Sequence, residues 1–204
     1  MPHRPASQPA ADRRSVREQA LRTAALELFT QRGYEATTMA DIGAAIGIRG
    51  PSLYKYVSSK QDLLAQVMTQ TMDNLLALHR KAVAGTEDVT QRLRRAAETH
   101  VRYHARHRQE AFVGNRELRH LREPHRRIVL GKRAAYEGAF RAIIEDGLEQ
   151  GRFHVASARL ASYAILDLGM GVAVWYREDG EHSEDEVVYQ YGDFALRLVG
   201  AVGA

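Results

Sequence analysis

The stretch of the chain at residues 41–64 reads DIGAAIGIRGPSLYKYVSSKQDLL. Its helical pattern is broken twice within a short distance, at Gly47 and again around Ser58. Glycine ends helices readily because it enters the left-handed backbone region at little cost, and serine favours the cap position before a new helix. The breaks therefore predict two short helices joined by a tight turn, followed by a third, longer helix.

Local capping signals place the ends of the two short helices. Thr38 is followed three residues later by Asp41, the pattern of a capping box, so a helix is expected over residues 39–46. Pro51 suits a first helical turn because its φ is fixed and it lacks an N–H group, so the second helix is expected over residues 51–57. Two short helices joined in this way are typical of helix-turn-helix proteins, in which the second helix enters the major groove of DNA.

The helix-turn-helix interpretation gives roles to the polar residues around the turn. The second helix and the turn before it are expected to contact bases and phosphates of the DNA. Helix N-termini favour an anion because their first N–H groups have no partner within the helix. The expected DNA contacts are Thr38, Arg49, Gly50, Ser52, Tyr54, Lys55 and Lys60. Two alternatives stay open: Tyr54 as a core residue and Lys60 as a solvated surface residue. Tyr56 is assigned to the domain core.

Apolar residues recur at helical spacing through most of the rest of the chain, and no strand pattern is found. A helix is expected over residues 15–32, ending at Gly33, and the long capped helix begins after Ser58 or Ser59. The chain is therefore expected to be all-α with about nine helices in total, the later ones over residues 90–107, 109–121, 124–150, 156–177 and 183–199.

The elements ALELF..RGY..TTM.DI, SLY.Y and SK.DLL occur in this order between residues 16 and 67. This segment resembles the N-terminal domain of the tetracycline-repressor (TetR) family of bacterial one-component regulators. The resemblance implies an all-helical homodimer with an N-terminal DNA-reading domain and a C-terminal domain that binds a small molecule and dimerises. The sequence departs from the family pattern at Gly43, where alanine is usual, and at residues 49–51, so the bases read stay undefined.

The chain divides into three expected parts. These are a mobile tail over residues 1–14, a helix-turn-helix domain over residues 15–62, and an effector-binding and dimerisation domain over residues 63–204. The segment 156–178 is apolar nearly all round and the segment 183–201 carries an apolar stripe. With the family resemblance, this pattern favours a four-helix bundle between two subunits, and the alternative is a purely intramolecular core.

Composition restricts the compartment and the partners. Cysteine is absent, which excludes disulfides and thiolate metal sites. The N-terminal residues hold no apolar run for a signal peptide, and no segment is expected to span a membrane, so the chain is expected to be cytoplasmic. The net charge of +4 arises within residues 1–60, which hold nine Arg and Lys against five Asp and Glu. A basic N-terminal part is consistent with double-stranded DNA as the partner.

A second basic region, residues 79–133, holds 15 Arg and Lys against six Asp and Glu. Its cations alternate with apolar side chains on three expected helices, a pattern that suits an apolar cavity with a cationic rim. The motifs FVGNREL, GLEQGRF and VWYR resemble those of TetR-family regulators of lipid and acyl-thioester catabolism, which respond to acyl-coenzyme A compounds. The expected effector contacts are Tyr103, Phe112, Asn115, Arg116, Arg119, Tyr136, Phe140 and Trp175, with Arg122 and Arg126 as further phosphate ligands.

Other interpretations of the C-terminal half stay open. The arginines also fit solvated helix faces paired with glutamates, and the effector also fits a neutral hydrophobic molecule or a metal ion. His100, His104 and His107 share one helical face, a spacing that can bind a metal, so an all-helical metal-dependent enzyme is the remote alternative. The sequence contains no nucleophile elbow, phosphate-binding glycine loop or paired-histidine zinc motif, so neither catalysis nor a cofactor is expected. Asp167, alone in an apolar helix, is expected to pair with a basic residue.

Overall fold

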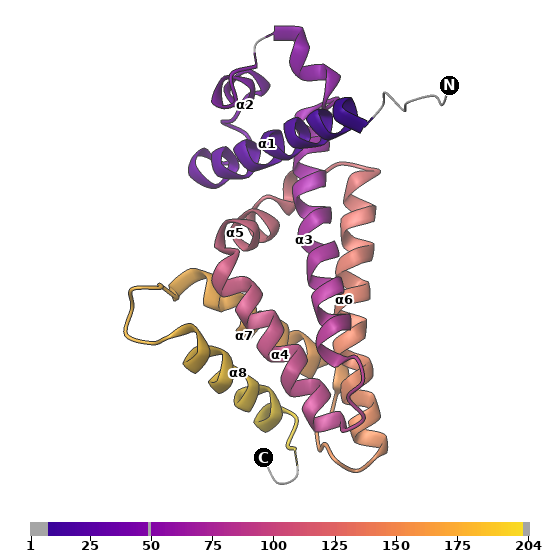
Figure 1. The fold of residues 1–204 in the computed structure, drawn as a ribbon. Coiled ribbons are helices and arrows are strands. Elements are labelled where there is room, and N and C mark those ends of the chain that lie inside the picture. The colour runs from indigo at the N-terminus through magenta and orange to yellow at the C-terminus, as the bar shows by residue number, and fades with distance from the viewer. Residues whose placement is uncertain (1–7, 49, 202–204) are drawn as a thin grey trace, which may run out of the picture.

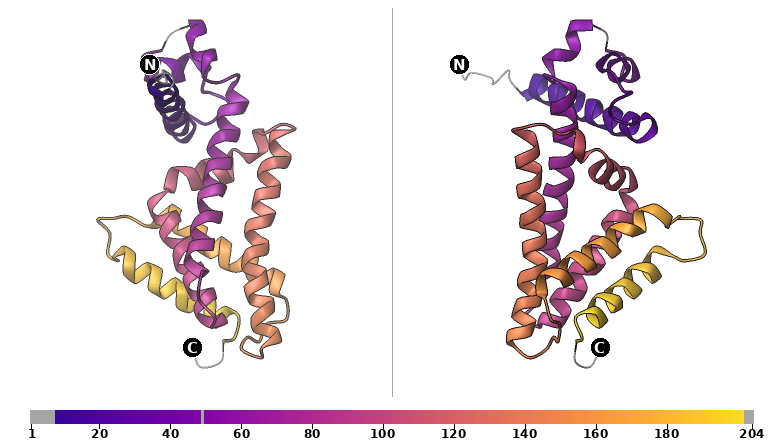
Figure 2. Two further views of the ribbon diagram at one scale, coloured as in Figure 1. Left: turned by 45° about the vertical axis from the view of Figure 1, so that its right-hand side comes forward. Right: turned by 180° about the vertical axis from the view of Figure 1, so that it is seen from behind.

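The computed structural model describes residues 8–48 and 50–201, and Figure 1 shows that this part of the chain is helical. It forms eight α-helices and two 3₁₀ helices, and the described residues include no strand. A small group of N-terminal helices lies at one end of the molecule. From this group α3 (Lys60–Val83) runs into a larger domain, where it packs along α6 (His125–Glu149) (Figures 1 and 2). The expected all-α fold is confirmed.

The N-terminal domain contains α1 (Gln8–Arg32), α2 (Met39–Ala45) and η1 (Gly50–Lys55). Helix α1 begins earlier than expected, so residues 8–14, which were assigned to a mobile tail, are helical, and residues 1–7 lie outside the described part. The second short helix is a 3₁₀ helix rather than an α-helix. Propensity does not distinguish the two, because they share nearly the same backbone angles and differ only in hydrogen-bond register.

Capping interactions fix where the helices start. The side chain of Thr38 accepts a hydrogen bond from the backbone of Asp41, whose carboxylate accepts one from the backbone of Thr38, so the expected capping box is confirmed. Ser59 caps α3 by accepting from the backbone of Asp62. Ser183 and Glu186 form a second capping box at the start of α8 (Glu184–Leu198). Each such cap typically stabilises a helix by about 1 kcal/mol.

The core of the N-terminal domain extends into the larger domain. Buried Leu21, Phe29 and Ile42 pack with Leu63 and Leu64 of α3. The same cluster also takes in apolar residues that follow α4 in the chain, namely Val113, Leu121 and Val129. The expected domain boundary after residue 62 therefore falls inside a continuous helix, and the two domains share buried surface.

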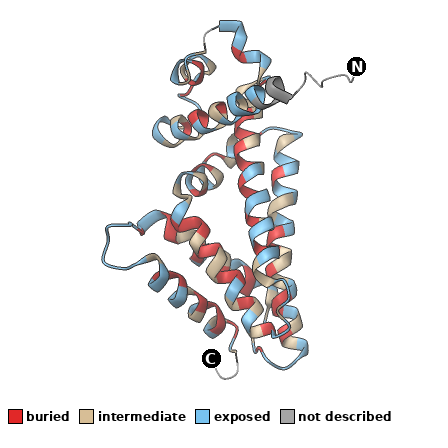
Figure 3. Cartoon of the chain, viewed as in Figure 1, coloured by how far each residue is buried: buried red, intermediate tan, exposed pale blue. Residues whose placement is uncertain are grey.

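The larger domain is built around α4 (Val89–Arg106), which packs against α3, α6, α8 and α7 (Ala158–Trp175). Buried positions, red in Figure 3, concentrate on α4 and on the helix faces turned toward it. The single helix expected over residues 109–121 is divided into α5 (Arg108–Arg116) and η2 (Leu118–His120). The division falls at Glu117, whose buried carboxylate lies 3.3 Å from Nε2 of His120.

Helix α7 meets the length and composition criterion for a membrane span, and it is the single helix of the described residues that does so. In the structure α7 packs against α4, α5, α6 and α8. A core helix can satisfy the same length and composition criterion as a membrane span. Only 33% of residues 158–175 is buried within this chain, however, and apolar Leu160 and Val174 of α7 are exposed.

Candidate nucleic-acid interface and effector cavity

The expected DNA-reading residues gather at the far end of the N-terminal domain. In η1 the side chain of Leu53 is buried in the domain core, whereas Ser52, Tyr54 and Lys55 are exposed. Tyr54 is 57% exposed, which is a high value for a tyrosine. Exposed Gly50 precedes them in a left-handed conformation at φ 62°, and Arg49 lies outside the described residues. Tyr56 is partly buried against the domain core.

The turn between the two short helices is tight enough to require glycine at two positions. Gly47 has φ 69°, which L residues with a side chain rarely adopt. A Cβ on Gly43 would lie 2.6 Å from the carbonyl oxygen of Ile48, whose N–H in turn donates to the carbonyl of Gly43 at 2.8 Å. The departure from the family's usual alanine at position 43 thus has a local cause, since the chain folds back directly onto this residue.

Two expected phosphate contacts are engaged within the domain. The Thr38 hydroxyl is exposed but is held in the capping box by Asp41. The Lys60 ammonium donates to the carbonyls of Tyr34 and Thr37, both at 2.7 Å, and lies 4.2 Å from the centroid of the Tyr34 ring. Burial lowers the pKa of Lys60. Lys60 therefore ties the loop before α2 to the start of α3, which is a structural role different from the expected phosphate contact.

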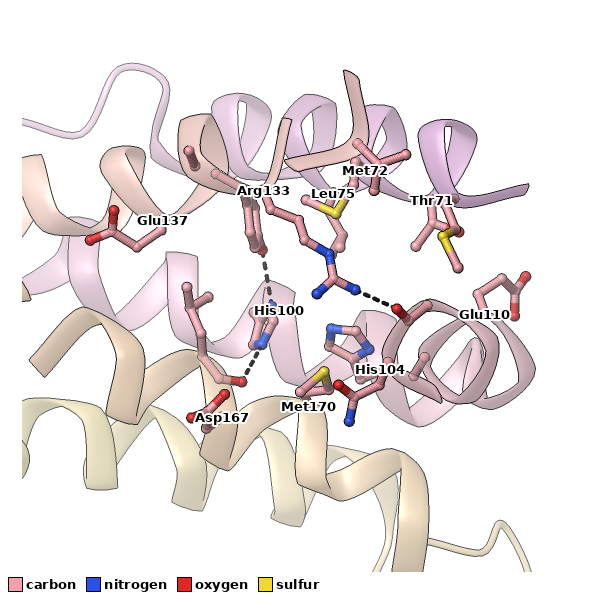
Figure 4. Close-up of a pocket in the computed structure, with 18 of the residues that line it drawn as sticks. Thr71, Met72, Leu75, His100, His104, Glu110, Arg133, Glu137, Asp167 and Met170 are labelled. Carbon is pink, nitrogen blue, oxygen red and sulfur yellow. Dashed lines mark hydrogen bonds between the residues drawn. The ribbon is translucent and has the colours of Figure 1, made fainter. Parts of the chain in front are cut away.

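A cavity of about 390 Å³ lies between α3, α4, α5, α6 and α7 (Figure 4). Much of its lining is apolar and flexible, because three methionines contribute to it together with Leu75 and Leu166. Its polar lining comes from all five helices, with three residues each from α6 and α7. The polar and charged lining residues are Thr71, His100, His104, Glu110, Asn115, Arg133, Tyr136, Glu137, Arg159, Tyr163 and Asp167.

Arg133 brings a positive charge into this cavity. Its Nη2 donates to the backbone carbonyl of Gly114 on the facing helix α5. No carboxylate of the described residues forms an ion pair with it, and burial lowers its pKa. Uncompensated charge in a partly buried site is costly, so this guanidinium is available to an anion.

Two buried histidines of α4 form the opposite wall. His100 is linked through Nδ1 to the Tyr136 hydroxyl and through Nε2 to the Leu166 carbonyl, both at 3.0 Å. Since the carbonyl can only accept, Nε2 carries the proton and Nδ1 accepts from the tyrosine. Burial lowers the pKa of His100 to about 4 and that of His104 well below its usual value, so both are neutral at pH 7. Nδ1 of His104 has no hydrogen-bond partner among the described residues.

The acidic groups around the cavity do not neutralise Arg133. Glu137 accepts a hydrogen bond from Ser162 at 2.7 Å and lies 3.4 Å from Nε of Arg141. Glu110 is 3.2 Å from Nδ1 of His107. Asp167 is exposed on α7 and forms no ion pair within the described chain, so the expected basic partner for it is not found there.

A second space, a groove, adjoins the cavity. It has a volume of about 1070 Å³ and shares Ala111, Asn115, Asp167 and Met170 with the cavity lining. Its other walls carry Arg108 of α5, which donates to the carbonyl of Ala173, together with Phe112 and Arg116. The guanidinium carbon of Arg116 lies 5.3 Å from the centroid of the Phe112 ring.

The structure separates the expected effector residues into three groups. Asn115 and Tyr136 line the cavity, and Phe112 and Arg116 line the groove. The other four lie away from both spaces: Tyr103 and Phe140 are buried in the core, Arg119 hydrogen-bonds to His120, and Trp175 contacts Tyr176 and Tyr191.

The prediction missed Arg133 and His104. A signal for Arg133 exists, because Val129, Arg133, Tyr136 and Glu137 recur at helical spacing and all four line the cavity. His104 was noticed only as one of three histidines at metal-binding spacing. Among the described residues, no group of three or more His, Cys, Asp or Glu side chains is placed to hold a metal ion.

A helix-turn-helix domain continuous with a helical domain that encloses a cavity defines a class of ligand-responsive, DNA-binding transcription regulators. Residues 21–67 match the model of bacterial regulatory proteins of the tetR family, and residues 86–199 match the model of the tetracyclin repressor-like C-terminal domain. The second match alone spans more than half of the chain. The protein belongs to the TetR family of bacterial transcription regulators.

Relatives with known names include both repressors and activators. The transcriptional repressor KstR2 of Rhodococcus jostii is 28% identical, covering 90% of this chain and 91% of that protein. The transcriptional activator FasR of Mycolicibacterium smegmatis is 30% identical, covering 89% and 82%. A tetR-family regulatory protein from Rhodococcus RHA1 has the same fold, with a TM-score of 0.85, 30% identity, and coverage of 91% and 97%. AibR, solved with isovaleryl coenzyme A and operator DNA, has a TM-score of 0.79 at 21% identity, covering 91% and 99%.

Proposed function

We propose that this protein is a cytoplasmic, homodimeric repressor that binds a palindromic operator and is released from it by an acyl-coenzyme A thioester. The observation that carries the proposal is the continuity of an apolar cavity with a groove bearing two arginines, Arg108 and Arg116. The cavity alone is too small for a whole acyl-coenzyme A. The apolar cavity suits the acyl group, and the arginines of the groove suit the phosphates of the coenzyme.

Two elements connect the cavity to the DNA-reading head. Met68 of α3 both lines the cavity and packs in the N-terminal core, and Val113 of α5 lies in that core next to the cavity-lining Gly114. Near the start of α3, the Gln61 side chain donates to the Tyr34 hydroxyl at 2.7 Å and to the His120 carbonyl at 2.8 Å. Helices α3 and α5 thus contact both the cavity and the core of the N-terminal domain. An effector that binds more tightly to one arrangement of these helices therefore shifts the population of positions of the DNA-reading domain.

The dimer surface is proposed on α7 and α8. Leu160 and Val174 of α7 are 69% and 76% exposed, and Tyr189 and Phe194 of α8 are exposed as well. Large apolar side chains gathered on one pair of helices mark an interaction surface. A symmetric dimer through them presents two reading heads to two half-sites, as a palindromic operator requires.

The function is tested by anisotropy measurements with the DNA upstream of the protein's own gene and with a scrambled duplex. We expect specific binding that weakens steeply as salt rises, and release by a member of a panel of acyl-coenzyme A thioesters. Lys55→Ala and Tyr54→Ala are expected to weaken the operator more than the scrambled duplex, whereas Lys81→Ala, exposed at the far end of α3, leaves both unchanged. If only a neutral hydrophobic molecule releases the specific binding, the protein is a ligand-responsive regulator but its effector is not an acyl-coenzyme A thioester.

A further inference from the structure

We propose that Arg133 is the anion-binding residue of the cavity and that the effector's acyl group carries a second carboxylate, which pairs with this guanidinium in place of the Gly114 carbonyl. The inference rests on the proposed function, because it takes the cavity as the effector site. It adds the chemical class of the acyl group and the residue that recognises it.

The first step is that Arg133 has no anionic partner within the described chain. Its one hydrogen bond to another described residue goes to the neutral carbonyl of Gly114. Of the three carboxylates that line the cavity, Glu137 and Glu110 are engaged by Ser162, Arg141 and His107, and Asp167 is exposed on α7 and forms no ion pair with Arg133. Around the guanidinium the lining includes Met72, Leu75 and Met170 (Figure 4). A cation in such surroundings gains most from a ligand that supplies the missing negative charge.

The second step distinguishes a carboxylate from a neutral acceptor. A ligand carbonyl would replace the Gly114 carbonyl with an equivalent partner and leave the charge uncompensated. A carboxylate accepts two parallel N–H donors from the planar guanidinium and neutralises it. The neutral imidazole of His104 faces the same space in Figure 4, and its Nδ1 lacks a partner among the described residues, so the cavity holds a further group able to bond to the ligand.

The third step concerns the transmission of binding. Gly114 belongs to α5, where its neighbour Val113 is fully buried in the core that supports the DNA-reading head. When a carboxylate pairs with Arg133, the hydrogen bond from Arg133 of α6 to the Gly114 carbonyl of α5 is broken. Helix α5 is then free to shift relative to α6, and the N-terminal domain shifts with it. A ligand without the second carboxylate leaves this bond in place.

The experiment compares matched thioesters that differ only in the terminal carboxylate. Octanoyl-coenzyme A and octanedioyl-coenzyme A, with shorter and longer pairs, are titrated calorimetrically into the wild-type dimer, Arg133→Met and Arg133→Lys. Arg127→Met is the control, since Arg127 lies on the same helix but is exposed and outside the cavity lining. The wild type is expected to prefer the dicarboxylic member by about tenfold to a hundredfold, as for a charge-assisted hydrogen-bond pair.

The variants make the result specific to Arg133. Arg133→Met is expected to abolish the preference while still binding octanoyl-coenzyme A, which also shows that it is folded. Arg133→Lys keeps the charge without the planar fork and is expected to retain part of the preference. Operator release by the dicarboxylic thioester is expected for the wild type and for Arg127→Met, and not for Arg133→Met.

Failure of this inference is distinguishable from failure of the proposed function. Equal affinity of the wild type for both members of every pair overturns the inference and leaves the thioester effector intact. If no thioester binds, the proposed effector is rejected, and free octanoate and octanol then provide the comparison. A preference for octanoate that disappears in Arg133→Met then supports Arg133 as the anion-binding residue and rejects the dicarboxylic acyl group, and the absence of such a preference overturns both parts of the inference.

Discussion

Acidification is expected to destabilise this protein through His100 in particular. The pKa of His100 is lowered to about 4 by burial, against an ordinary value of 6.5, so the unfolded chain takes up a proton at a pH where the folded chain does not. The stabilisation by neutral His100 is complete above pH 6.5 and is lost as the pH falls from 6.5 to about 4. That gap corresponds to about 3 kcal/mol, most of which is lost between pH 7.5 and 4.5.

The assay is urea unfolding followed by circular dichroism at fixed protein concentration and several pH values. Buried His79 and His104 also have lowered pKa values and add to the loss, so the share of His100 is isolated with His100→Gln. Residue 100 cannot titrate in this variant, so its free energy of unfolding is expected to fall by about 2–3 kcal/mol less than that of the wild type over the same pH range. His182→Gln, in the exposed loop before α8, is the control. Parallel curves for wild type and His100→Gln would refute the reasoning.

Three further predictions concern packing, the interdomain loop and the dimer. Gly169→Ala places a Cβ against the His100 ring and is expected to lower the free energy of unfolding by about 1–3 kcal/mol in a urea titration. The control is Gly171→Ala, whose Cβ meets no atom within 4 Å and which is expected to show no loss. Lys60→Met leaves the carbonyls of the loop before α2 without their hydrogen-bond donor. The free energy of unfolding, measured with heat or urea, is expected to fall by about 1.5–3 kcal/mol, and an unchanged value would contradict the structural role of Lys60. Val174→Glu is expected to yield monomers by sedimentation velocity, while Val16→Glu on α1 stays dimeric, and a dimeric Val174→Glu would place the interface elsewhere.

The helices were predictable because their signals are local. Thr38 and Asp41 start a helix through contacts within a single turn, and this capping box is present as expected. The early start of α1 was missed because polar residues and alanines are compatible with both a helix and a disordered tail.

The candidate site was less predictable because it depends on contacts between distant segments. Lys60 has the position expected of a phosphate ligand, and only the folded loop shows that carbonyls from residues 34–37 surround its ammonium. Aromatic composition suggested Phe140 as a ligand contact, whereas packing buries it completely. Arg133 was overlooked among many arginines, because its distinction lies in what surrounds it: an apolar cavity, the Gly114 carbonyl and no carboxylate partner within the described chain.

A ligand in the larger domain is expected to control binding of DNA by the smaller one. This coupling is measured by anisotropy of the labelled duplex from upstream of the protein's own gene, titrated with the protein in the absence and presence of each acyl-coenzyme A thioester. We expect specific binding that one thioester weakens by at least about tenfold, corresponding to a coupling free energy of about 1.4 kcal/mol. If that thioester binds the protein and the affinity for the operator does not change, the ligand in the larger domain does not control DNA binding.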